Sequence, residues 1–151
     1  MLDSDSDDEE QARIGAERAK KRGNEAFAAG DYHEAVKHFS VGIRLEPHNH
    51  VLHSNRSAAY ASLKQASAAL ADAEECVRLL PSWVKGYSRK GAALILGGQY
   101  KEAMRAYKRG LELEPDNAGL KKGLEDLRAS LQEGELPSAG SASSPRRSRP
   151  P

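Results

Sequence analysis

Apolar residues recur at helical spacing over most of this chain, and the pattern is interrupted at regular intervals. Pro47, Pro81 and Pro115 lie 34 residues apart, and a leucine stands two residues before each of them. Small residues repeat with the same offset, at Ala35, Ala69 and Ala103 and at Gly42, Cys76 and Gly110. Self-similarity at a fixed period of this length predicts an array of stacked repeats. We place the repeats at residues 16–49, 50–83 and 84–117.

Each repeat contains one internal turn signal, so each is predicted to be a pair of antiparallel helices. The signals are Gly30-Asp31, Lys64-Gln65 and Gly97-Gly98,. A pair of this kind cannot cover its apolar face alone and packs on its neighbours. Leucines at 120, 124, 127 and 131 then form one apolar stripe, which predicts a capping helix over residues 117–133,. The predicted fold is all-α, with three helix pairs and a C-terminal capping helix.

Both ends of the chain are expected to be disordered. Residues 1–10 include six acids and no base, and such a like-charged run has almost nothing to bury,. Residues 134–151 are rich in Ser, Pro and Arg, a composition that does not form a packed core,. The folded domain is therefore predicted to span residues 11–133.

Missing motifs and the charge distribution argue against several classes of function. The sequence offers no nucleophile–base pair, no glycine-rich phosphate loop and no metal-ligand spacing, so we expect neither an enzyme nor a cofactor,. His48, His50 and His53 lack an acidic or cysteine partner nearby, and zinc needs a third or fourth convergent ligand,. The net charge of +1 conceals an acidic N-terminus, and residues 11–133 are only mildly and evenly basic, so the chain does not resemble a nucleic-acid module,.

The number of cysteines also indicates the cellular compartment. Cys76 allows no disulfide within the chain, and at a small-residue position of the repeat it is expected to serve packing,. No apolar run approaches the length of a membrane span, and the acidic N-terminus is unlike a secretory presequence,. We expect a monomer in a reducing compartment, the cytoplasm, with the nucleus as an alternative.

The repeat resembles a known family. A 34-residue period with Gly, Tyr, Ala, Phe or Tyr, and Pro at these relative positions is similar to the tetratricopeptide repeat, TPR,. Arg22, Ser57 and Lys64 depart from the family's usual residues at their positions. The resemblance implies a right-handed superhelical array in which the first helix of every repeat lines the concave side.

Polar residues on these first helices can be placed by their spacing. At about 100° per residue, Lys85 and Arg89 of the third repeat fall on one side, and Tyr87, Gly91 and Leu94 fall on the opposite side,. Lys20, Asn24 and Asn55 share the arc of Lys85 and Arg89, which is about 100° wide,. Lys and Arg supply charge-assisted donors, and Asn donates without adding charge. This set suits two adjacent carboxylates better than a phosphate.

These five residues resemble the two-carboxylate clamp of co-chaperone TPR domains, with NHVLHSNRSAAYA and KGYSRKGAAL carrying the likeness. The resemblance implies a non-enzymatic adaptor that binds the C-terminal Glu-Glu-Val-Asp of cytosolic heat-shock chaperones, of the seventy-kilodalton class by preference or of the ninety-kilodalton class. It implies that Lys20, Asn24 and Asn55 hold the main-chain carboxylate, that Lys85 serves the Asp side chain and that Arg89 braces the peptide.

The prediction also includes an apolar pocket, an alternative function and a regulatory role for the N-terminus. Ala58 and Ala61 are expected to floor a shallow pocket for an apolar side chain of the ligand. The alternative function is a TPR scaffold that binds internal segments of other partners. A further hypothesis is that the acidic residues 1–10 fold back over the groove and compete with the ligand.

Overall fold

Seven α-helices make up the part of the chain that the computed structural model describes, residues 2–134 and 136, and this confirms the all-α prediction. None of these helices is long and apolar enough to cross a membrane. The helices are α1 (Leu2–Ala28), α2 (Tyr32–Leu45), α3 (His50–Ser62), α4 (Ala66–Leu79), α5 (Val84–Leu96), α6 (Tyr100–Leu113) and α7 (Ala118–Gln132).

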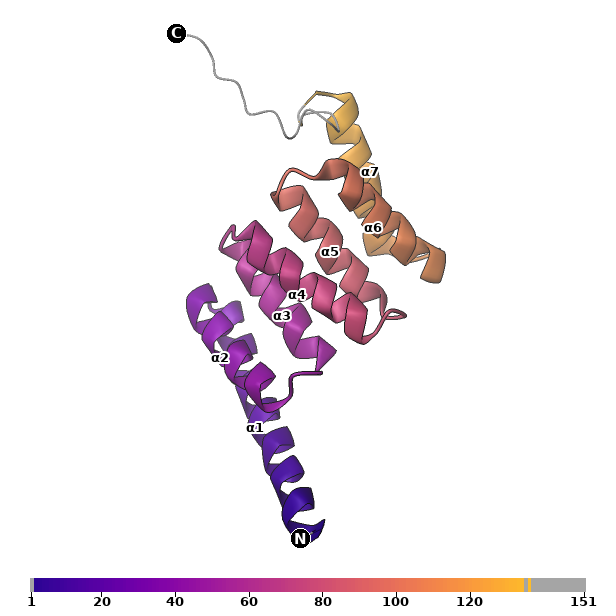
Figure 1. Ribbon diagram of the computed structural model, residues 1–151. Coiled ribbons are helices and arrows are strands. Elements are labelled where there is room, and N and C mark those ends of the chain that lie inside the picture. Colours follow the sequence, from indigo (N-terminus) through magenta and orange to yellow (C-terminus); the bar gives the residue numbers. More distant parts are fainter. Residues whose placement is uncertain (1, 135, 137–151) are drawn as a thin grey trace.

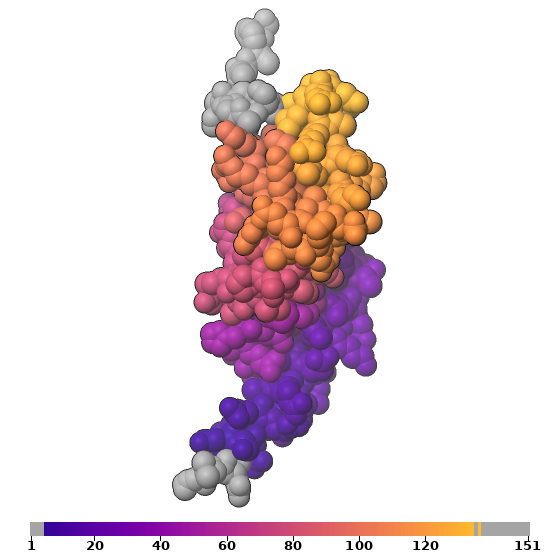
Figure 2. Space-filling model, turned by 90° about the vertical axis from the view of Figure 1, so that its right-hand side faces the viewer, coloured from indigo at the N-terminus to yellow at the C-terminus, as the bar shows by residue number. Residues whose placement is uncertain are grey.

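The helices form successive antiparallel pairs that stack along one axis. α1 packs on α2, α3 on α4 and α5 on α6, and each pair also packs on the next (Figure 1). The stack is elongated, with the repeats following one another from the N-terminal to the C-terminal end (Figure 2). Contacts between α1 and α3 and between α3 and α5 place the first helices of the three repeats side by side.

Small residues allow the two helices of a pair to approach closely. A Cβ added at Gly23 would collide with the ring of Phe39, and one added at Gly91 would collide with the ring of Tyr107. The middle repeat has Ser57 at the glycine position, and its aromatic position is Ala73, which leaves room for the serine side chain. Ser57 is buried and its Oγ donates to the carbonyl of Ala69 at 2.8 Å. The larger serine at the glycine position is therefore accommodated by the smaller alanine at the aromatic position of the same repeat.

Cys76 serves packing, as predicted. Its side chain is fully buried, and burial raises the pKa of the thiol to about 11. A thiol with that pKa is protonated at neutral pH and unreactive, since the thiolate is the nucleophile.

The prediction that residues 1–10 are disordered is wrong from Leu2 onward, because α1 begins there. Acids at a helix N-terminus interact favourably with the helix dipole, and the packed second half of α1 supplies the nucleus on which the first half propagates. Side chains from Asp5 to Gln11 are all exposed, and Glu10 pairs with Arg13. The start of the helix points away from the repeats rather than back across them (Figure 1), which argues against the fold-back hypothesis.

The C-terminal cap agrees with its prediction to within one residue at each end. The side chain of Asn117 accepts a hydrogen bond from the backbone N–H of Leu120 at 2.9 Å, and Leu120, Leu124 and Leu127 are buried. Leu136 is half-buried and packs on the core of the third repeat, so the folded part extends beyond the predicted limit at residue 133. The predicted disorder of residues 137–151 lies outside the described residues.

Candidate peptide-binding site

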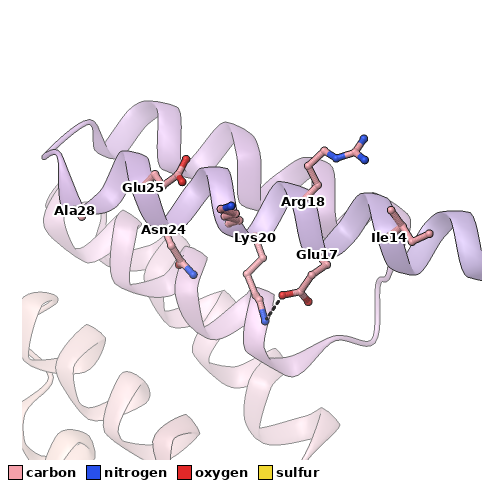
Figure 3. A pocket seen from close by; sticks show the side chains of 8 residues that line it. Ile14, Glu17, Arg18, Lys20, Asn24, Glu25 and Ala28 are labelled. Carbon is pink, nitrogen blue, oxygen red and sulfur yellow. Dashed lines mark ion pairs between the residues drawn. The ribbon is translucent and has the colours of Figure 1, made fainter.

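Lys20 and Asn24 point from the same side of α1, while Arg18 points away from them (Figure 3). They are four residues apart, which places them one above the other on a helix. Both residues line a shallow hollow of about 740 Å³ along α1, which residues on the neighbouring side of the helix, Arg18 among them, line as well. Lys20 Nζ lies 3.4 Å from a carboxylate oxygen of Glu17, an exposed acid that is not among the predicted site residues.

Asn24 and Asn55 connect the first helix to the third. The amide nitrogen of Asn55 donates to the amide oxygen of Asn24 at 3.1 Å. This bond uses the acceptor of Asn24, so both N–H groups of its amide are left for another acceptor. The two amides are thereby oriented before any ligand arrives.

Arg89 is half-buried on α5, and its guanidinium is held by a neutral group. Nε donates to Oγ of Ser54 at 3.0 Å. Burial lowers the pKa of Arg89, although the group stays charged at every physiological pH,. Within residues 2–134 and 136, no carboxylate forms an ion pair with it. A partly desolvated cation without a counter-charge favours the binding of an external anion.

The five predicted clamp residues lie along a row of adjoining clefts. Lys20 and Asn24 line the hollow on α1. Asn24, Asn55 and Arg89 line a cleft of about 250 Å³ together with Phe27, Phe39 and Ala58. Arg89 also lines the next cleft, of about 360 Å³, with the exposed Lys85. Because Asn24 and Arg89 each belong to two clefts, the row is continuous from α1 to α5.

The apolar part of the site differs from its prediction. Ala58 lines the central cleft, whereas Ala61 is half-buried and does not line it. The floor is instead supplied by Phe27 and Phe39, whose helical positions indicate packing and gave no signal of a site. Ser54 was also missed, yet a signal existed: it is the fifth residue of its repeat, as Lys20 is of the first.

His53 belongs to a buried ionic cluster with Asp72 and Arg56. Its Nε2 donates to the carbonyl of Pro47 at 2.9 Å, and Nδ1 lies 3.6 Å from Oδ1 of Asp72. Asp72 also receives two bonds from Arg56, at 2.7 and 2.8 Å. Among the described residues, no three His, Cys, Asp or Glu side chains gather closely enough to hold a metal ion.

Burial and hydrogen bonding compete at this cluster. Burial alone would raise the pKa of Asp72, but the two hydrogen bonds from Arg56 and the proximity of the His53 ring outweigh it and hold the pKa below its usual value of 3.8. The interaction with Asp72 raises the pKa of His53 above 6.5 despite burial. The cluster joins α3 to α4, and Arg56 extends it to α2 through Oγ of Ser40 at 3.0 Å.

A stack of helix pairs whose first helices bring amides and cations into a row of adjoining clefts defines a helical-repeat protein. Comparison with known proteins agrees with this class. The family described as "Tetratricopeptide repeat" matches residues 84–117. A solved structure, the first TPR of Spaghetti (RPAP3) bound to the HSP90 peptide SRMEEVD, is 37% identical, with a TM-score of 0.74 over 79% of this chain and 94% of that one.

Two further proteins are similar to this chain. The second TPR domain of human RPAP3, solved with the HSP70 peptide SGPTIEEVD, is 29% identical, with a TM-score of 0.74 over 78% of this chain and 98% of that one. The Hsp70-Hsp90 organizing protein of Triticum aestivum is 56% identical over 113 residues, 75% of this chain. This chain spans only 19% of that relative's length. The chain belongs to the tetratricopeptide repeat family.

Proposed function

We propose that this chain is a non-enzymatic co-chaperone module that binds the C-terminal Glu-Glu-Val-Asp segment of the heat-shock chaperones HSP70 and HSP90. Two relatives of the same fold are solved with peptides of this kind, SRMEEVD and SGPTIEEVD. The Hsp70-Hsp90 organizing protein of Triticum aestivum is similar over three quarters of the chain.

The observation that carries the proposal is the state of Arg89. Its guanidinium is half-buried, is held through Nε by a serine hydroxyl and lines a cleft beside two asparagine amides. A carboxylate in this cleft would supply the missing counter-charge in a partly desolvated site, where charge-assisted bonds are strongest.

The other clamp residues extend the same chemistry in both directions. Lys20, Asn24 and Asn55 would hold the main-chain carboxylate of the last residue, and Lys85 would pair with the Asp side chain. Bonds to charged groups contribute about 1.5–3 kcal/mol each before ordering costs. A micromolar complex needs about 8 kcal/mol net, which five such bonds reach when most of them lie near the upper end of this range.

Isothermal titration calorimetry with the peptide SGPTIEEVD tests the proposal. The free-acid peptide should bind in the micromolar range, and the same peptide amidated at its C-terminus should lose at least tenfold, about 1.4 kcal/mol. Arg89→Ala should abolish measurable binding. Arg105→Ala is the matched control, because Arg105 is exposed on α6 and pairs with Glu102 away from the clefts.

Equal affinity for the acid and the amide would refute the clamp and favour the alternative, a scaffold that binds internal segments. A comparison of SGPTIEEVD with SRMEEVD tests the predicted preference for the seventy-kilodalton class. The cytoplasmic location and the monomeric state remain predictions from sequence. Size-exclusion chromatography with light scattering tests the second of them.

A further inference from the structure

Ser54 is a completely buried serine between two of the predicted clamp helices. It lies on α3, directly before Asn55, and its exposed fraction is 0%. Its Oγ accepts from Nε of Arg89 on α5 at 3.0 Å, across 35 residues of sequence. The hydroxyl cannot turn toward solvent, so the bond has a fixed geometry.

This bond determines which edge of the guanidinium is free. Arginine can bind a carboxylate with two parallel N–H bonds either through Nε and one Nη, or through the two Nη atoms. Since Nε of Arg89 already donates to Ser54, the first edge is occupied. The edge formed by Nη1 and Nη2 is left for a ligand in the clefts that Arg89 lines.

We propose that Ser54 is a positioning residue that makes Arg89 bind its carboxylate through Nη1 and Nη2. The inference rests on the proposed function, because it concerns how the same clamp recognises its peptide. The carboxylate then lies in the plane of the guanidinium at its outer end, and each oxygen accepts one N–H bond.

The choice of serine follows from charge. A carboxylate at position 54 would hold Nε equally well, but it would neutralise the cation on which binding depends. An alanine would leave Nε unpaired and free to turn toward the ligand. A neutral acceptor fixes the group and leaves its charge available.

The test is calorimetry of SGPTIEEVD with Ser54→Ala. We expect affinity to fall about tenfold, the usual effect of one lost positioning bond to a charged group. Ser57→Ala is the matched control: Ser57 is also buried on α3, but its hydroxyl donates to the carbonyl of Ala69 and not to a clamp residue. It should reduce stability and leave affinity unchanged.

A double-mutant cycle separates positioning from general damage to α3. In an Arg89→Lys background the side chain has no Nε and keeps its charge. Ser54→Ala should then change affinity by less than about twofold. Equal weakening in both backgrounds would overturn the proposal, as would unchanged affinity of Ser54→Ala in the natural background.

A nuclear magnetic resonance spectrum of the arginine side chains gives a readout that does not depend on folding stability. The Nε–H signal of Arg89 should be present in the free protein and shift little when SGPTIEEVD is added, while its Nη signals shift. A large shift of the Nε–H signal on binding would overturn the proposal. Failure of the proposed function is distinguishable, because the unaltered protein would then not bind the peptide at all.

Discussion

Nδ1 of His53 and Oδ1 of Asp72 lie 3.6 Å apart inside the second repeat, where both residues are buried. Because Nε2 of His53 donates to a backbone carbonyl, the neutral ring leaves Nδ1 unprotonated, and this atom has no hydrogen-bond partner. A proton on Nδ1 would face the carboxylate and bond to it. The second repeat is therefore better satisfied when His53 is charged.

Stability should consequently fall as the pH rises above about 6.5,. The folded-state pKa of His53 is raised above 6.5 by Asp72, so the protonated form stabilises the fold,. That contribution is complete below about pH 6.5 and is lost as the pH rises through the folded pKa. Urea unfolding at a series of pH values should show a free energy of unfolding that declines over this window.

His53→Phe should remove most of this decline. His33→Gln, a change at an exposed histidine on α2, is the control and should leave the profile intact. A slope that survives His53→Phe would show that another group is responsible.

Removal of the acid at the centre of the cluster should be more costly. Asp72→Asn removes the carboxylate charge and one of the two acceptors that the partly buried Arg56 uses, and breaking a buried pair typically costs about 3 kcal/mol,. Chemical denaturation measures the loss. Glu75→Gln, which breaks an exposed pair with Arg78, is the control and should change stability little,.

Lys64 provides an opportunity for stabilisation. It adopts a left-handed φ of 63° in the turn between α3 and α4, where the corresponding turns have Gly30 at 82° and Gly98 at 79°. A left-handed conformation costs a non-glycine residue about 1–2 kcal/mol, part of which glycine loses again through unfolded-state entropy. Lys64→Gly should raise the free energy of unfolding by about 0.5–1 kcal/mol. Gly98→Ala should lower it by a similar amount.

Glu17 competes with an acidic ligand for Lys20. Its carboxylate lies 3.4 Å from Lys20 Nζ, and it adds a negative charge beside the clefts. Glu17→Gln should tighten binding of SGPTIEEVD about two- to threefold at low ionic strength. Glu34→Gln removes a pair of the same spacing and distance with Lys37 on α2, and should have no effect on affinity. Equal effects of the two changes would indicate only a response to net charge.

The sequence predicted the helix pairs and their stacking because these depend on periodic features. Prolines and small residues 34 residues apart fix where helices end and where they approach, and Tyr87, Gly91 and Leu94 are buried as their spacing predicted. The arc that joins Lys20, Asn24 and Asn55 with Lys85 and Arg89 follows from the same period. A residue's role in one repeat therefore predicts the role of the residue at the corresponding position in the next.

Features that depend on contacts between different repeats could not be predicted in this way. The bond from Arg89 to Ser54 and the floor supplied by Phe27 and Phe39 need the actual rotation of neighbouring helices. The helical start of α1 was missed because charge composition outweighed helix propensity in the prediction. Acids at that end of a helix favour it, and the packed half of α1 extends it.

The sharing of residues between clefts has a consequence for how substitutions combine. Lys20 and Lys85 each line one outer cleft, whereas Asn24 and Arg89 each line two. Changes at the two lysines should therefore contribute independently, because they have no partner in common. Asn24 and Arg89 both line the central cleft, and each also lines one outer cleft. The loss of binding free energy in the double variant should therefore be smaller than the sum of the two single losses. Additive effects on the binding free energy at the two lysines, and non-additive effects at Asn24 and Arg89, would show that the middle of the row acts cooperatively while its two ends act independently.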